Sequence, residues 1–260
     1  MNVFIFTLGT RGDVQPYVAL GRGLVAAGHR AVVCTDSRFR PLILEHGLEA
    51  AEFNGLFTEL TDSAVGREIM ESAGTAWQLL KSMPRLLRLS ARMQQALMDD
   101  GWRAAQAAAP DLIVYHPKAF GGPHFAERLR VPVAMAVPLP MLVPTGEFPV
   151  IGFPRLPLGA AYNRATYLVL NRLMRTISGK PIARWRRSQG LPSVSGRQDW
   201  LRTRAGQPIP VLHAYSPLVG LVPADWPESA GATGAWYLDQ PAGWKPGADL
   251  AAFLEAGPPP

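Results

Sequence analysis

The chain has 260 residues, of which 48% are hydrophobic and 18% are charged, and its formal net charge is +6. This length accommodates one large domain or two small ones, and the composition excludes an intrinsically disordered chain. The single cysteine excludes an intramolecular disulfide, and Cys34 lies in an apolar run, so we expect a buried thiol and a reducing, cytoplasmic compartment.

The sequence predicts neither a leader nor a membrane span. Met1 leads directly into a strand pattern, without the basic segment and cleavage site of a signal peptide. The longest apolar stretch, Val131–Pro144, is interrupted by prolines and is too short to cross a bilayer. We therefore expect a soluble protein that is at most peripheral to a membrane.

The first two elements meet in a turn that contains an acid. We expect a strand over Val3–Leu8 and a helix over Val14–Ala27, whose apolar residues recur at helical spacings. Asp13 stands where a helix N-cap belongs, and Pro16 falls in the first turn, where its missing N–H matters little. A carboxylate and free backbone N–H groups are thus expected at the carboxyl edge of a sheet, where ligands bind in open α/β proteins.

Two glycines precede this acid, and they limit the kind of site. Gly9 and Gly12 permit positive φ angles and a close approach of other groups to the backbone. Their spacing does not match the dinucleotide-binding fingerprint, and no Walker lysine follows, which excludes both nucleotide motifs as written. The alternative explanation of Asp13 is ordinary helix capping, which needs no paired glycines.

Strands and helices alternate through the rest of the chain. Further strands are expected over Ala31–Thr35, Ala50–Phe53, Asp111–Tyr115, Val131–Val137 and Val211–His213. Helices are expected over Arg40–His46, Asp62–Ala109 with an interruption at Pro84, Gly121–Leu129 and Tyr162–Ser188. This order predicts an α/β fold with a Rossmann-like, mostly parallel, doubly wound sheet and right-handed crossovers.

Two segments lack a regular pattern. Pro138–Ala160 is rich in proline, glycine and apolar residues, and a loop of this length in a compact domain is usually functional. After residue 222, prolines alternate with glycine and alanine, which is typical of a linker, with one short amphipathic stretch at Asp249–Glu255. We therefore predict a domain over residues 1–222 and an interdomain linker over residues 223–260.

Positive charge is concentrated between Phe148 and Gln198, a window without Asp or Glu. Its basic residues are Arg155, Arg164, Arg172, Arg175, Lys180, Arg184, Arg186, Arg187 and Arg197. Three interpretations are open: a helix face that is solvated or paired with acids elsewhere, a surface for anionic membranes, and a docking face for another domain. The window contains no nucleic-acid recognition motif, so we expect no nucleic-acid partner.

Three segments, in this order, resemble one enzyme family. Gly9–Pro16 is similar to the start of a GT-B glycosyltransferase of the branch that contains sterol 3-β-glucosyltransferases, the family 28 type and antibiotic-glycosylating enzymes. Tyr115–Glu127 with Pro132–Phe148 resembles the middle of that family's N-terminal domain. Asp225–Pro227 and Thr233–Asp239 resemble the segment that leads into its second domain.

This resemblance implies the acceptor-binding half of an inverting hexosyltransferase. The enzyme would move a hexose from a nucleotide sugar to a hydroxyl of an apolar acceptor, such as a sterol or a macrolide. The nucleotide sugar is a co-substrate held by a second domain that the sequence lacks, so we expect no cofactor and no activity from this chain alone. The competing interpretation is a non-catalytic module that binds an apolar ligand or docks a partner, as in two-subunit glycosyltransferases.

The resemblance also assigns roles around the first turn. Asp13 matches the base that takes the proton of the acceptor hydroxyl. Gly9, Thr10, Arg11 and Gly12 would face the donor diphosphate, because backbone N–H groups at a helix start favour anions. For Arg11, a charge-assisted contact with the diphosphate and a solvated position are both open.

The acceptor pocket is expected to be apolar, with His116 at its mouth. The side chains proposed to line it are Trp77, Leu80, Met83, Phe120, Leu139, Met141 and Phe148. Core packing is the alternative explanation for each of them. The five histidines do not show the spacing of metal ligands, so we expect no metal site.

Overall fold

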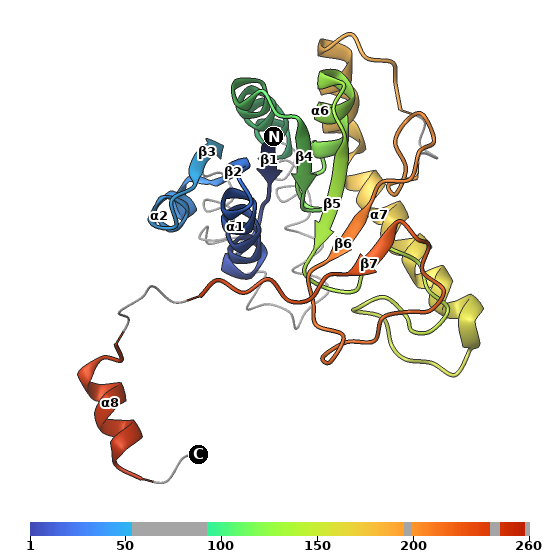
Figure 1. The fold of residues 1–260 in the computed structure, drawn as a ribbon. Coiled ribbons are helices and arrows are strands. Elements are labelled where there is room, and N and C mark those ends of the chain that lie inside the picture. The colour runs from blue at the N-terminus through green and yellow to red at the C-terminus, as the bar shows by residue number, and fades with distance from the viewer. Residues whose placement is uncertain (54–92, 195–198, 240–244, 258–260) are drawn as a thin grey trace, which may run out of the picture.

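A computed structural model describes residues 1–53, 93–194, 199–239 and 245–257 (Figure 1). Within these ranges a seven-stranded sheet has the order β3-β2-β1-β4-β5-β6-β7, and every pair of neighbours is parallel. The strands are β1 (Asn2–Phe6), β2 (Arg30–Asp36), β3 (Glu49–Phe53), β4 (Leu112–Tyr115), β5 (Val133–Val137), β6 (Val211–His213) and β7 (Ala230–Ala232). The predicted parallel, Rossmann-like α/β fold is confirmed.

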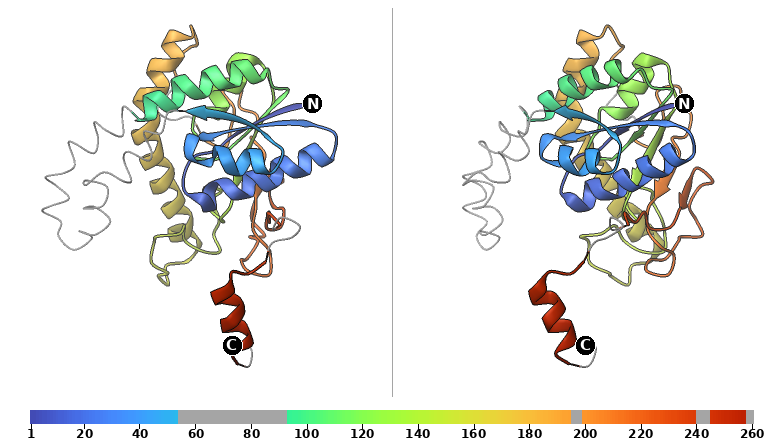
Figure 2. Two further views of the ribbon diagram at one scale, coloured as in Figure 1. Left: turned by 90° about the vertical axis from the view of Figure 1, so that its left-hand side faces the viewer. Right: turned by 60° about the vertical axis from the view of Figure 1, so that its left-hand side comes forward.

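Helices cover both faces of this sheet (Figure 2). One face carries α1 (Arg11–Ala26) and α2 (Arg40–Glu45), and the other carries a helix over residues 93–108, α6 (Gly122–Leu129) and α7 (Gly159–Ser188). Successive residues of a strand point to opposite faces. Val3 and Ile5 of β1 therefore pack towards α1, while Phe4 and Phe6 pack in the other core.

The start of α1 differs from the prediction. The helix begins at Arg11 with Thr10 as its N-cap, so the prediction of Asp13 as the N-cap was wrong. Asp13 is the third helical residue, and its carboxylate reaches back to the N–H of Thr10. An acid at the third helical position can satisfy an N–H at the helix start and interacts favourably with the positive end of the helix dipole. With Thr10 as the N-cap, the helix therefore begins at Arg11, before the predicted Val14. Pro16 consequently lies inside the helix and leaves the carbonyl of Gly12 without its usual partner.

The chain between β5 and α7 is irregular, as predicted, and it is anchored at one end. Asp225 accepts hydrogen bonds from the hydroxyl of Thr145, from the N–H of Gly146 at 2.7 Å and from the guanidinium of Arg164 at 2.8 Å. The hydroxyl of Thr145 is the largest influence that lowers the pKa of Asp225 to about 2. This carboxylate therefore ties the long loop to both α7 and the C-terminal part of the chain.

A buried ion pair joins α7 to α6. Arg186 is 1% exposed, and its guanidinium donates to both carboxylate oxygens of Glu127, at 2.6 and 2.9 Å. The same guanidinium lies 3.1 Å from Nδ1 of His124 and donates to the carbonyl of Pro192 at 2.8 Å. Arg186 and Arg164 of the basic window are thus paired with acids elsewhere, as one of the three interpretations expected.

The C-terminal part of the chain is not wholly separate from the sheet. β7 lies within residues 223–260 and pairs with β6. Residues 233–239 then run back along the carboxyl ends of the strands to α1, where Trp236 packs edge-on against Tyr17 with 6.1 Å between ring centroids (Figure 1). The predicted amphipathic stretch forms α8 (Ala248–Glu255), which leaves Phe253 70% exposed.

Two further expectations concern Cys34 and the membrane. Cys34 is buried in β2, and burial raises the pKa of its thiol, in agreement with the expected inert cysteine. Among the described residues, no helix combines the length and the apolar character that a bilayer crossing requires. The predicted helical region Asp62–Ala109 is described only from residue 93 onward.

Candidate functional site

The ends of β1 and β4 bring three distant side chains together. These strands are parallel neighbours, so the segments that follow them meet at the same edge of the sheet. His116 follows β4 directly, and its N–H donates to the carbonyl of Phe6 at 2.8 Å. Asp13 of α1 therefore lies beside His116 and Lys118.

Both oxygens of the Asp13 carboxylate have partners. Oδ2 accepts from the N–H of Thr10 at 2.8 Å, from the hydroxyl of Thr10 at 3.2 Å and from Nζ of Lys118 at 2.9 Å. Oδ1 lies 3.4 Å from Nε2 of His116. The Asp13 side chain is 18% exposed, so this carboxylate is mostly enclosed but still reaches solvent.

The surroundings keep Asp13 ionised. Burial is the largest single influence and raises its pKa, but the hydrogen bonds from Lys118 and Thr10 and the positive charge of Lys118 together outweigh burial. The pKa of Asp13 is therefore below its ordinary value. A charged carboxylate stands at the carboxyl edge of the sheet at neutral pH.

His116 is a neutral partner of this carboxylate. Burial lowers the pKa of His116 to about 4, and Lys118 lowers it further, against the opposing effect of Asp13. Its Nδ1 accepts a hydrogen bond from the backbone N–H of Lys118 at 3.1 Å, so the proton of the neutral ring is on Nε2. That N–H faces Oδ1 of Asp13.

Gly9 gives the turn a backbone conformation that residues with a side chain rarely adopt. Its φ angle is +146°, and an added Cβ would lie 2.1 Å from Oδ2 of Asp13. The hydroxyl of Thr7 donates to the backbone carbonyl of Asp13 at 2.7 Å, and Arg38 donates to the carbonyl of Gly9 at 2.8 Å. The backbone of the turn is therefore held at both ends, at Gly9 and at Asp13.

The other residues expected on the donor side are exposed at this helix start. Thr10, Arg11 and Gly12 form the first turn around the N-cap of α1. The Nε of Arg11 donates to Gln15 at 2.9 Å, along the surface of the same helix.

The residues proposed to line the acceptor pocket are spread between core and surface. Phe120 is 5% exposed and belongs to the core beneath α6 and α7. Met141 and Phe148 are half-buried, and Leu139 is 51% exposed. Trp77, Leu80 and Met83 lie outside the described residues.

Three residues that contact the site were not predicted from the sequence. Lys118 contacts Asp13, and Tyr17 packs between His116 and Trp236 and donates from its hydroxyl to the carbonyl of Ala136. These contacts join positions that are far apart in sequence, so no local spacing indicates them. The sequence did contain one indication: Lys118 follows His116 by two residues just after a strand, which places both at the same edge of the sheet.

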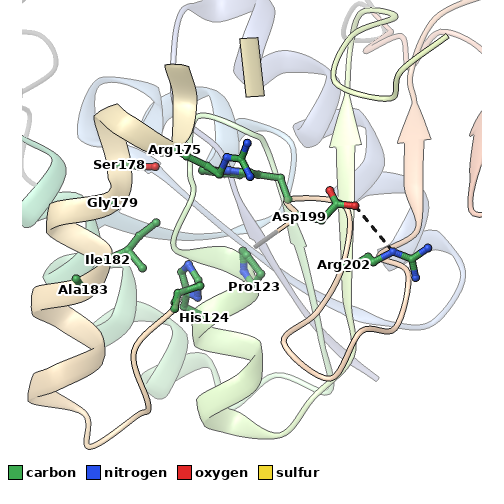
Figure 3. Close-up of a pocket in the computed structure, with 11 residues that line it drawn as sticks. Pro123, His124, Arg175, Ser178, Gly179, Ile182, Ala183, Asp199 and Arg202 are labelled. Carbon is green, nitrogen blue, oxygen red and sulfur yellow. Dashed lines mark ion pairs between the residues drawn. The ribbon is translucent and has the colours of Figure 1, made fainter. Parts of the chain in front are cut away.

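A cavity of about 120 Å³ lies elsewhere, between α6, α7 and the segment around Trp200 (Figure 3). Its lining includes His124, Arg175, Ile182 and Arg202. None of the predicted acceptor residues and none of the partners of Asp13 line it. Among the residues that the structure describes, no group of three His, Cys, Asp or Glu side chains is placed to hold a metal ion.

Residues 3–145, more than half of the chain, match the glycosyltransferase family 28 N-terminal domain. The chain belongs to this family. The match includes the turn that holds Asp13 as well as His116 and Lys118.

Relatives of this family 28 chain include sterol 3-beta-glucosyltransferases from fungi. The protein from Aspergillus terreus is 34% identical over 258 residues, and that from Sclerotinia sclerotiorum is 33% identical over 256 residues. Both alignments cover 98% of this chain but 17% of the relative. The chain therefore spans about a sixth of the length of these relatives.

Solved structures show the same fold. The glycotransferase of kitacinnamycin superposes with a TM-score of 0.59 at 16% identity, over 95% of this chain and 55% of that one. The calicheamicin glycosyltransferase superposes with a TM-score of 0.56 at 16% identity, over 95% of this chain and 54% of that one. At this identity the likeness shows that the chain shares the fold of one part of a GT-B glycosyltransferase.

The structure of the turn predicts that alanine destabilises the protein much more at Gly9 than at Gly12. Gly9→Ala would force a strained φ angle and displace the carboxylate of Asp13, so we expect a loss of about 1–3 kcal/mol in the free energy of unfolding. Gly12→Ala is the matched control, because its Cβ would meet nothing closer than the Thr10 hydroxyl at 3.8 Å. Urea denaturation of both variants measures the difference, and equal stability would contradict the account of the turn.

Proposed function

We propose that this chain supplies the catalytic base and the acceptor-binding side of an inverting glycosyltransferase. The observation that carries the proposal is the ionised carboxylate of Asp13, held at the carboxyl edge of a parallel sheet by Thr10, His116 and Lys118. Membership of glycosyltransferase family 28 supports the reaction class. The donor is a nucleotide sugar, which is a co-substrate.

The chemistry requires one proton acceptor and one departing anion. Asp13 takes the proton of the acceptor hydroxyl as the hydroxyl oxygen forms a bond to the anomeric carbon of the sugar. The bond between that carbon and the diphosphate oxygen breaks on the opposite side, so the configuration inverts and the nucleoside diphosphate leaves. The exposed start of α1 at Arg11 and Gly12 offers backbone N–H groups to the departing charge.

The acceptor proposed for this reaction is an apolar molecule with a hydroxyl group, and a sterol is the first choice. The fungal relatives are named as sterol 3-beta-glucosyltransferases. Leu139, Met141 and Phe148 follow β5 in the long loop and offer apolar surface that is exposed or half-buried. Such side chains suit a rigid apolar ligand.

The nucleotide is assigned to a second domain outside this sequence. The shared fold covers about half of the solved glycosyltransferases, which supports a division of the substrates between two halves. The competing function is a non-catalytic module that binds an apolar ligand or a partner domain. Its support is the exposed basic face of α7, where Arg172, Lys180 and Arg184 have no acidic neighbour in the sequence window.

Removal of the base tests the proposal most simply. In an enzyme completed by a donor-binding domain, Asp13→Asn should lower kcat by about 10²- to 10⁴-fold with little change in KM, because the base acts in the transition state. The amide can still accept from Thr10, so the fold should be retained. Asp99→Asn, an exposed acid on the helix over residues 93–108, is the control. Near-normal turnover of Asp13→Asn would refute the assignment.

Calorimetry on the chain alone tests the division of substrates. We expect measurable binding of a sterol presented in cyclodextrin and little or no binding of UDP-glucose or TDP-glucose, because the donor site lies on the other domain. Micromolar binding of either nucleotide sugar by this chain would show that the domain roles are assigned wrongly.

A peripheral membrane contact is a second part of the proposal, and α7 provides its surface. Leu168, Val169 and Leu173 are 61%, 54% and 54% exposed, with the exposed Arg172 between them and the exposed Lys180 and Arg184 further along the same helix. Apolar side chains interleaved with arginine and lysine favour the interface of an anionic bilayer. A sterol acceptor would be drawn from such a bilayer.

Vesicle sedimentation tests this surface. Each basic residue near an anionic bilayer contributes about 1 kcal/mol, and the attraction fades within a Debye length. We expect binding to phosphatidylserine vesicles at low salt that weakens towards physiological salt and is lost on charge reversal at Arg172, Lys180 and Arg184. Charge reversal at Arg22 of α1, at Arg128 of α6 and at Arg130, the C-cap of α6, is the matched control, because all three are exposed. Equal binding to neutral vesicles would contradict the electrostatic attraction.

A further inference from the structure

The partners of Asp13 crowd one of its two carboxylate oxygens. Oδ2 accepts from the N–H and the hydroxyl of Thr10 and from Nζ of Lys118, whereas Oδ1 has Nε2 of His116 at 3.4 Å. A general base must have a lone pair within hydrogen-bond reach of the proton that it removes. Oδ2 can therefore act as the base only after one of its partners has left it.

Lys118 is the partner that can leave. Its side chain is 49% exposed, and its ammonium group is carried on a flexible four-carbon stem. The N–H of Thr10 is fixed by the start of α1, and the ring of His116 is 6% exposed and fixed through its Nδ1. Movement of the Lys118 side chain disturbs neither of these contacts, because it is the backbone N–H of Lys118 that holds His116.

The group best able to attract Lys118 is a diphosphate. Nζ of Lys118 lies 2.9 Å from Oδ2 of Asp13, next to the first turn of α1, where backbone N–H groups favour an anion. Lysine binds phosphate well as a point charge, and a diphosphate carries more negative charge than one carboxylate. The donor of the proposed reaction brings this group to the site.

We propose that Lys118 is a positioning residue that pairs with Asp13 as in this structure and moves to the diphosphate of the nucleotide sugar when the donor binds. This movement frees Oδ2 to take the proton of the acceptor hydroxyl. The inference rests on the proposed function, and it adds a coupling: the base is released only when the donor is present. Lys118 itself neither gains nor loses a proton.

The electrostatics of the site agree with this role. Among the influences that lower the pKa of Asp13, the hydrogen bond from Lys118 is the largest. Departure of Lys118 raises that pKa and makes Asp13 a stronger base. The same movement therefore frees Oδ2 and increases its affinity for a proton. His116 remains in place and continues to face Oδ1.

The first test needs only the 260-residue chain and no activity. Carboxyl carbon NMR follows the titration of Asp13 in the wild type, in Lys118→Met and in the control Lys180→Met, whose lysine lies on α7. We expect the pKa of Asp13 to rise in Lys118→Met and to match the wild type in Lys180→Met. An unchanged pKa in Lys118→Met would overturn the inference.

The second test separates a moving lysine from a static ion pair, in an enzyme completed by a donor-binding domain. Lys118→Met should raise KM for the donor about tenfold, as expected for a lost charge-assisted contact, and Lys118→Arg should recover part of it. The acid limb of the kcat/KM profile follows the pKa of Asp13 in the free enzyme, so it should move to higher pH in Lys118→Met. The acid limb of the kcat profile follows the substrate complex, in which Lys118 has already left Asp13, so it should stay in place. An unchanged donor KM, or an equal shift of both limbs, would overturn the inference.

These outcomes are distinguishable from failure of the proposed function. If Asp13→Asn keeps its turnover, Asp13 is not the base, whatever Lys118 does. If Asp13→Asn is inactive and Lys118→Met leaves the donor KM unchanged, Asp13 remains the base and the inference about Lys118 is wrong.

Discussion

The site depends on the absence of a side chain at Gly9. Because no Cβ is present there, the carboxylate of Asp13 can fold back over the turn to the N–H of Thr10. This contact starts α1 at Arg11 and places the charge at the carboxyl edge of the sheet. Any other residue would put a carbon atom where the carboxylate lies and would also require a φ angle that favours glycine.

The parallel sheet supplies the rest of the site. It places the end of β4 beside the end of β1, so His116 and Lys118 reach the carboxylate of Asp13. The neutral ring of His116 and the charged ammonium of Lys118 have different consequences. The neutral ring of His116 faces one oxygen without adding charge, whereas Lys118 lowers the proton affinity of the carboxylate and has a side chain that is 49% exposed. In the proposed mechanism, the paired carboxylate and the available base are two states of this cluster.

Sequence patterns were sufficient for the fold and for the position of Asp13, because both depend on local spacing. Alternating strands and helices predicted the parallel sheet, and the glycine turn after the first strand marked the site. The N-cap was predicted three residues late, because a cap acid and an acid that reaches back from the first turn give similar patterns. Lys118 was missed because its contact with Asp13 joins residues 105 positions apart. Arg186, buried against Glu127, has the same local pattern as its exposed neighbour Arg187.

The central claim is that Asp13 takes the proton of the acceptor hydroxyl. The most direct measurement is a crystal structure of this chain completed by a donor-binding domain, with an acceptor and a non-transferable nucleotide-sugar analogue bound. The account predicts that the reacting hydroxyl oxygen lies roughly 2.6–3.2 Å from a carboxylate oxygen of Asp13, directly or through one water. A hydroxyl beyond the reach of one bridging water, in contact with a different titratable side chain, would contradict it.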